Sequence, residues 1–183
     1  MLGIKPRIII ARLLLSTAVA ASIINFSPTS IASENNSLGE AIAITTDRNS
    51  SELADVVQQV HQKINQYRSS LDLDPLSLND QISQQAEAHS QDMAQHKVKF
   101  SHQGFASRIK ALANDIFYRS AAENVAYNQG YGDPAEQAVT GWLKSEGHRQ
   151  NIVGNYNLTG IGVAKNQQGE YYFTQIFIRG SLD

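Results

Sequence analysis

The stretch TGIGVAKNQQGEYYFTQIFI, residues 159–178, decides the fold class of this 183-residue chain. Its two halves, residues 159–164 and 171–178, are rich in β-branched and aromatic residues, as strands are. Between them lies the turn-forming sequence Asn-Gln-Gln-Gly at 166–169. This pattern predicts a β-hairpin with a four-residue loop. A further strand is expected within residues 116–127.

Helical periodicity precedes the hairpin. Val56, Val60 and Ile64 recur at spacings of four residues, which places them on one stripe of an amphipathic helix. Three helices are predicted in this part of the chain, over residues 52–69, 79–97 and 107–114. Asn79 is a favourable N-cap residue for the second of them. Because helices come first and strands last, without a regular βαβ alternation, we expect an α+β sandwich built on a mainly antiparallel sheet.

A fourth helix has the clearest start signal in the sequence. Asp133 is a favourable N-cap residue, Pro134 suits the first helical position, and Glu136 completes a capping-box pattern. Gly147 is expected to end this helix, because glycine readily adopts the left-handed backbone conformation found at helix C-termini. His148 would then leave the helix at its C-terminus.

The first 32 residues have the composition of a secretory signal peptide. Three basic residues and no acidic ones accompany an apolar run over residues 8–24, and the small residues Ser30 and Ala32 offer a cleavage site. An uncleaved anchor is the alternative, although Arg12 interrupts the apolar run. We therefore predict a signal peptide at 1–32, a flexible linker at 33–51 and a folded domain at 52–183. The mature protein would be secreted, extracellular or periplasmic, and would have no stable membrane span.

Composition excludes several classes of function. The chain has no cysteine, so disulfides, thiolate metal sites and cysteine catalysis are ruled out. Its formal net charge is −2, and no segment combines clustered basic residues with aromatic residues that could stack on bases. Nucleic acid is therefore not expected as a partner.

Two of the five histidines are candidates for a functional site. His102 lies in a loop beside Gly104, and His148 follows Gly147. His89 and His96 share one face of a predicted helix but lie about 10.5 Å apart along its axis, too far to hold one metal ion by themselves. We expect both of these to be surface residues.

An ordered series of short motifs resembles the signature of the SCP/CAP superfamily of secreted proteins, which includes cysteine-rich secretory proteins, venom allergens and plant pathogenesis-related proteins. The resemblance covers residues 61–178, and seven motifs in order make a specific signal. The motifs are INQYR at 64–68, PL at 75–76, FSH at 100–102, AENVA at 122–126, WLKSEGHRQNI at 142–152, IGV at 161–163 and YFTQIF at 172–177.

The resemblance implies a three-layer α-β-α sandwich with a cleft lined by two histidines and two acidic residues. The histidines correspond to His102 and His148, and the first acidic residue corresponds to Glu123. The fourth position is open: Ser145 stands where animal and plant members have glutamate, and Glu146 follows one residue later. The resemblance also suggests lipid or sterol binding as a function, but no local motif indicates it.

Imidazoles and carboxylates that converge in a cleft have three possible roles. They can bind Zn²⁺ or another divalent cation, act as general acid and base, or form a structural hydrogen-bond network. Our first hypothesis is a secreted binding module in which His102, Glu123, Glu146 and His148 hold a metal or another small, unidentified extracellular ligand. The alternative is an extracellular hydrolase acting on peptide or cell-envelope material, with Ser101, Ser145 or a metal-bound water as nucleophile.

Overall fold

A computed structural model describes residues 28–180, and the side chains of residues 48–180. Residues from Ile42 onward form one compact unit, and the described part of the other unit, residues 28–41, is helical. The elements are α1 (Pro28–Ser69), β1 (Ser77–Leu78), α2 (Asp80–Ala94), α3 (Phe105–Leu112), β2 (Tyr118–Gln129), α4 (Pro134–Lys144), α5 (Glu146–Ile152), β3 (Leu158–Lys165) and β4 (Glu170–Gly180).

The four strands form one mixed sheet in the order β1-β3-β4-β2. The predicted hairpin is confirmed as β3 and β4, which pair antiparallel from Leu158 with Ile178 to Lys165 with Tyr171. β2, the strand expected within 116–127, pairs antiparallel with the other side of β4. β1 is a two-residue strand that the sequence analysis missed, and it pairs parallel with the start of β3.

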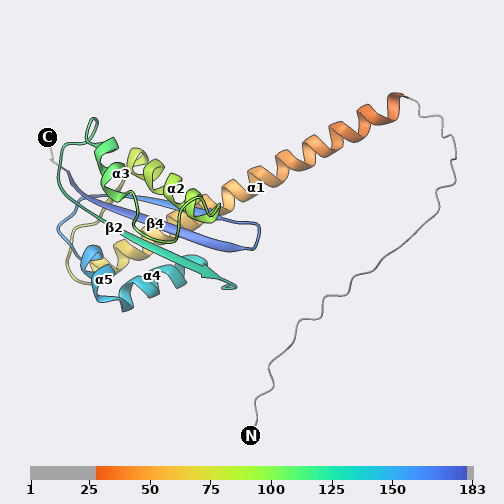
Figure 1. The fold of residues 1–183 in the computed structure, drawn as a ribbon. Helices are drawn as coiled ribbons and strands as arrows, with labels where there is room; N and C mark the ends of the chain where they lie inside the picture. Colours follow the sequence, from red (N-terminus) through yellow and green to blue (C-terminus); the bar gives the residue numbers. More distant parts are fainter. Residues whose placement is uncertain (1–27, 181–183) are drawn as a thin grey trace, which may run out of the picture. The chain divides into compact units, whose positions relative to one another are not determined.

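Helices cover both faces of this sheet, with α2 and α3 on one side and α4 and α5 on the other (Figure 1). On the α4 side, Trp142 and the α1 residues Val60 and Ile64 pack against Phe173 and Phe177. On the α2 side, a second apolar cluster contains the buried residues Ile82, Ala86, Ile109, Leu112, Ile116, Ile176 and Ile178. The predicted α+β, three-layer α-β-α architecture is therefore confirmed.

Two glycines let α2 lie directly on β3. A Cβ atom added at Gly160 or Gly162 would lie 2.3 Å or less from backbone atoms of α2. Any side chain at these positions would separate the helix from the strand, so the close contact requires glycine. The side chains of Ile161 and Val163, which alternate with the glycines, lie in the core cluster on the α1 side.

The predicted helix starts are confirmed by their capping contacts. The Asn79 side chain accepts a hydrogen bond from the Ile82 N–H, and the Asp133 side chain accepts one from the Glu136 N–H. The predicted end of the fourth helix is wrong. α4 ends at Lys144, because Ser145 adopts an extended conformation, and a new helix, α5, begins at Glu146. Gly147 and His148 lie inside α5.

α1 is longer than the helix predicted from residue 52. It begins at Pro28, a residue suited to a first helical position, and so includes the 33–51 segment that we expected to be a linker. Helix-favouring Ala, Leu and Glu residues among the polar ones in this segment are compatible with the extension. The predicted signal peptide lies mostly outside the described residues. Within them, no helix is long and apolar enough to span a membrane.

A buried arginine joins the end of α1 to the segment before β3. Arg68 is 2% exposed, and its guanidinium donates hydrogen bonds to the carbonyls of Asp74, Ile152 and Gly154 over 2.8–3.0 Å. A longer contact of 3.4 Å reaches the carbonyl of Tyr156. Several acceptors compensate the cost of removing this cation from water.

Candidate functional site

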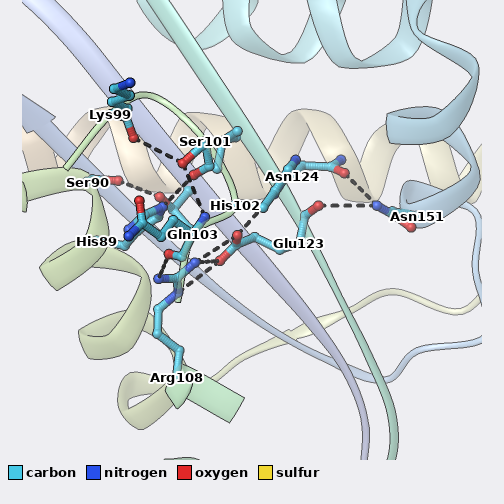
Figure 2. A network of polar contacts seen from close by, with 12 residues as sticks. His89, Ser90, Lys99, Ser101, His102, Gln103, Arg108, Glu123, Asn124 and Asn151 are labelled. Atoms are coloured by element: carbon cyan, nitrogen blue, oxygen red, sulfur yellow. Dashed lines mark hydrogen bonds and ion pairs between the residues drawn. The ribbon is translucent and has the colours of Figure 1, made fainter. Parts of the chain in front are cut away.

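His102, Glu123 and Arg108 form the centre of the site (Figure 2). His102 comes from the loop between α2 and α3, Arg108 from α3 and Glu123 from β2. The Nδ1 atom of His102 lies 3.0 Å from Oε1 of Glu123. Since an ionised carboxylate has no hydrogen to donate, Nδ1 donates and the lone pair of a neutral ring lies on Nε2.

The Glu123 carboxylate is buried and fully engaged. Its side chain is 1% exposed, and that of Arg108 is 11% exposed. Arg108 donates through Nε to Oε2 at 3.0 Å, and through Nη2 to Oε1 at 2.9 Å and Oε2 at 2.7 Å. Together with the His102 contact, both oxygens are occupied. The carboxylate is thus neutralised by a guanidinium and orients an imidazole.

His148 lies next to His102. The centroids of the two rings are 6.4 Å apart, with an angle of 45° between their planes. The side chain of His102 is 51% exposed, and His148 is half-buried. Burial lowers the pKa of His148, and the nearby His102 lowers it further. Both causes favour the neutral imidazole, which has a nitrogen lone pair that can bind a ligand.

Two asparagines fix α5, and with it His148, against β2. The Asn124 side chain donates to the carbonyl of His148 at 3.1 Å. The Asn151 side chain donates to the Asn124 side-chain oxygen at 2.8 Å and to the Glu123 carbonyl at 3.3 Å. The fold thus brings residues 102, 123 and 148 to one place, although they come from three separate elements.

His89 supports the loop that carries His102. We expected a surface residue, but His89 is only 4% exposed, and its Nε2 lies 2.8 Å from the carbonyl of Ser101. Burial lowers the pKa of His89. The surface prediction for this histidine is wrong because helical spacing does not show which loop folds over a helix; His96 is exposed, as expected.

The fourth predicted cleft residue lies outside this network. Glu146 is exposed on α5, where its Oε1 accepts a hydrogen bond from Gln150 at 3.3 Å. Across residues 28–180, no group of three or more His, Cys, Asp or Glu side chains is arranged to hold a metal ion. A four-ligand cage therefore does not fit this donor set. An open site made by the two imidazoles, with Glu123 orienting one of them from behind, does fit it.

Among the described residues, the hydroxyl of neither predicted serine nucleophile is hydrogen-bonded to a histidine side chain. The Ser101 hydroxyl donates to the carbonyl of Lys99 and accepts from the Gln103 N–H, both at 3.2 Å. Ser145 caps the junction of α4 and α5 without a side-chain capping bond. The hydrolase hypothesis stays a prediction that no contact in the described region favours.

Sequence reasoning missed Arg108 and the positioning role of the two asparagines. A signal for Arg108 did exist: a glutamate in the middle of an apolar strand needs a cation once it is buried, and α3 carries an arginine close to the predicted cleft loop. Asn124 directly follows Glu123 in the AENVA motif. Nothing in the sequence alone shows that it reaches the backbone of α5.

Comparison with family models matches residues 61–177 to the Cysteine-rich secretory protein family, abbreviated CAP. The chain belongs to the CAP family.

Among curated proteins, it is similar to the uncharacterized protein YkwD of Bacillus subtilis, with 36% identity over 137 residues that cover 73% of this chain and 51% of YkwD. It is also similar to the uncharacterized membrane protein YlbC of B. subtilis, with 39% identity over 94 residues, 50% of this chain and 25% of YlbC. The chain thus matches about half of one curated relative and a quarter of the other.

Solved structures of other CAP proteins share the fold. An extracellular protein of Bacillus anthracis that contains an SCP domain aligns with a TM-score of 0.59 and 30% identity, over 69% of this chain and 41% of that one. A cysteine-rich secretory protein of Staphylococcus aureus aligns with a TM-score of 0.55 and 20% identity, over 69% of this chain and 39% of that one. The second likeness concerns the fold alone.

Proposed function

We propose that this CAP domain acts outside the cell as a binding module, and that His102 and His148 hold a divalent cation such as Zn²⁺ in an open cleft. The description of the B. anthracis relative as extracellular supports the location. The contact of Glu123 with Nδ1 of His102 carries the metal proposal, because it turns the Nε2 lone pair of an exposed ring toward ligands.

Glu123 has a different role in this proposal from the one that the resemblance implied. Its two oxygens already accept hydrogen bonds from Arg108 and His102, so it acts through His102 and does not ligate the ion. A carboxylate behind a metal-binding imidazole fixes the tautomer and increases the basicity of the ligand. With two protein ligands, further positions on the ion remain for water or for an acidic group of an extracellular partner.

Zn²⁺ titration of the purified protein by calorimetry tests this proposal. We expect one ion per chain, with binding abolished by His102→Ala or His148→Ala, since each removes one of only two protein ligands. His96→Ala is the matched control, because it removes an exposed histidine in the turn after α2, and it should leave binding unchanged. Binding that survives the double variant His102→Ala/His148→Ala would overturn the site.

A second variant separates the two-histidine site from the four-residue site expected from the sequence. Glu146→Gln removes a charge and keeps the size of an exposed side chain. The open site predicts unchanged Zn²⁺ affinity in this variant. A clear loss of affinity would restore Glu146 as a ligand and reject the arrangement proposed here.

A further inference from the structure

One edge of the sheet lacks a partner strand over most of its length. β1 pairs only with Leu158 and Thr159 at the start of β3, while β4 covers the opposite edge of β3 throughout. Between residues 160 and 165, no strand in the described part of the chain pairs with β3 on the β1 side. Such an edge presents backbone donors and acceptors in the spacing that another extended chain can match.

The hydrogen bonds at the start of β3 show which peptide groups face this open side. The Asn79 N–H donates to the carbonyl of Thr159 at 2.9 Å, and the Ile161 N–H reaches the hydroxyl of Ser83 at 3.3 Å. Because peptide groups alternate in direction along a strand, the N–H and C=O of Val163 face the same side. Among the described residues, no hydrogen bond uses these two groups.

The open edge lies at the bottom of a groove between α1 and α2. Two adjoining cavities, of about 600 and 320 Å³, follow the edge and share Leu53, Glu87 and Val163 in their linings. Each falls within the range of about 300–1,000 Å³ that ligand sites occupy. The helices α1 and α2 supply the lining on either side of the strand, so the groove runs along its edge.

The two walls of the groove differ in chemistry. The α1 wall presents the apolar residues Leu53, Ala54 and Val57 beside the uncharged polar residues Asn49, Ser50 and Gln58. The α2 wall presents the exposed carboxylates of Asp80 and Glu87. The one lysine that lines the groove, at its far end, already pairs with a carboxylate outside it. Opposite charge on a bound ligand would therefore complement the α2 wall.

We infer that this groove binds an extended peptide segment of another protein, which adds a strand to the open edge of β3. Successive side chains of a strand point to opposite faces of a sheet, so such a segment would alternate apolar residues toward α1 with basic residues toward α2. A second copy of this chain is a poorer occupant, because edge-to-edge pairing would bring two acidic α2 walls together. The groove lies at the opposite edge of the sheet from Glu123, and the inference does not depend on the proposed metal site.

A short synthetic peptide tests this inference with the purified protein. The probe is fluorescently labelled, blocked Lys-Val-Lys-Val-Lys-Val-Lys, and its binding is followed by fluorescence anisotropy. Its analogue N-methylated at alternate residues has the same charge but cannot form the ladder of hydrogen bonds, and we expect it to bind at least about tenfold more weakly. The Glu-Val counterpart should also bind at least about tenfold more weakly. Equal binding of either control peptide would overturn the inference.

Protein variants locate the binding. The double variant Asp80→Asn/Glu87→Gln should weaken the Lys-Val peptide several-fold, while Asp55→Asn, which neutralises an exposed acid of α1 outside this groove, should not. The double variant His102→Ala/His148→Ala should leave peptide binding intact, so the proposals for the peptide site and for the metal site are tested independently. Peptide-independent dimers in sedimentation experiments that the Lys-Val peptide dissociates would identify a second copy as the occupant and reject the inference.

Discussion

β2 and β3 form the two long outer edges of the sheet, and the two edges differ in the side chains that hydrogen-bond to their backbone. On β2, the indole N–H of Trp142 donates to the carbonyl of Val125 at 3.0 Å, and the Asn151 side chain reaches the carbonyl of Glu123. On β3, the last such contact is that of Ser83 with Ile161. Side chains from α4 and α5 bind two outward carbonyls of β2, whereas the backbone groups of Val163 on β3 have no hydrogen-bond partner among the described residues.

This difference corresponds to two kinds of binding. Beside the closed edge at β2, the rings of His102 and His148 lie 6.4 Å apart on segments that are hydrogen-bonded to β2, which suits a small ligand held by a few atoms. At the open edge, peptide groups have no partner strand in the described part of the chain, which suits a ligand that has a peptide backbone. Three substitutions test how firmly each edge depends on the contacts described above.

Arg108→Met should have the largest effect, at the closed edge. It leaves the carboxylate of Glu123 buried without its cation, and losing one partner of a buried ion pair costs about 3–5 kcal/mol. Urea unfolding, followed by circular dichroism, measures the change in the free energy of unfolding. The double variant Arg108→Met/Glu123→Met removes both charges and should recover much of the loss. A single variant as stable as the parent would show that the pair is not needed at this edge.

Gly162→Ala should have the next largest effect, at the open edge. The new Cβ would lie 2.1 Å from a backbone nitrogen of α2, so helix and strand must separate, at a cost of about 2–3 kcal/mol. Gly141→Ala, on the exposed face of α4 with nothing within 4 Å of the new atom, is the matched control. It should stabilise the protein by about 0.5–1 kcal/mol. Equal thermal stability of the two variants would mean that α2 does not lie on β3 as described.

Trp142→Phe should have the smallest effect of the three. It leaves the outward carbonyl of Val125 without a donor, which costs about 1–2 kcal/mol in a buried position. Phe173→Leu reduces the volume of the same core cluster without touching an edge hydrogen bond. Hydrogen exchange separates the two variants: faster exchange confined to the β2 edge is expected for Trp142→Phe only, and identical exchange maps would contradict a role for the indole at that edge.

The elements with strong local signals could be predicted from the sequence. The hairpin, the Asn79 and Asp133 caps and the α+β class all depend on residues close together in the chain, and all are confirmed. The end of α4 could not be predicted, because the extended conformation of Ser145 comes from its place between two packed helices. In α5, Gly147 has no positive φ and simply continues the helix.

For the candidate site, the sequence predicted which residues belong to it but not how they are arranged. The motifs identified His102, Glu123 and His148, and the fold brings these three together. Their arrangement depends on contacts between distant segments, such as Arg108 with Glu123 and Asn124 with His148, for which periodicity carries no information. The predicted metal coordination by Glu123 and Glu146 stays untested. The geometry favours a role for Glu123 in orienting His102, and it leaves the Glu146 side chain exposed to solvent.

The backbone carbonyls that accept hydrogen bonds from Arg68 constrain the order in which the protein can fold. Two of the short contacts join this arginine to residues 84 and 86 positions further along the chain. During synthesis, the end of α1 therefore waits, without these acceptors, until residues 152 and 154 have been made. The central strand β4 comes later still, so a growing chain cannot complete its sheet before this strand has been made. The domain therefore stays open until its last strand has been synthesised.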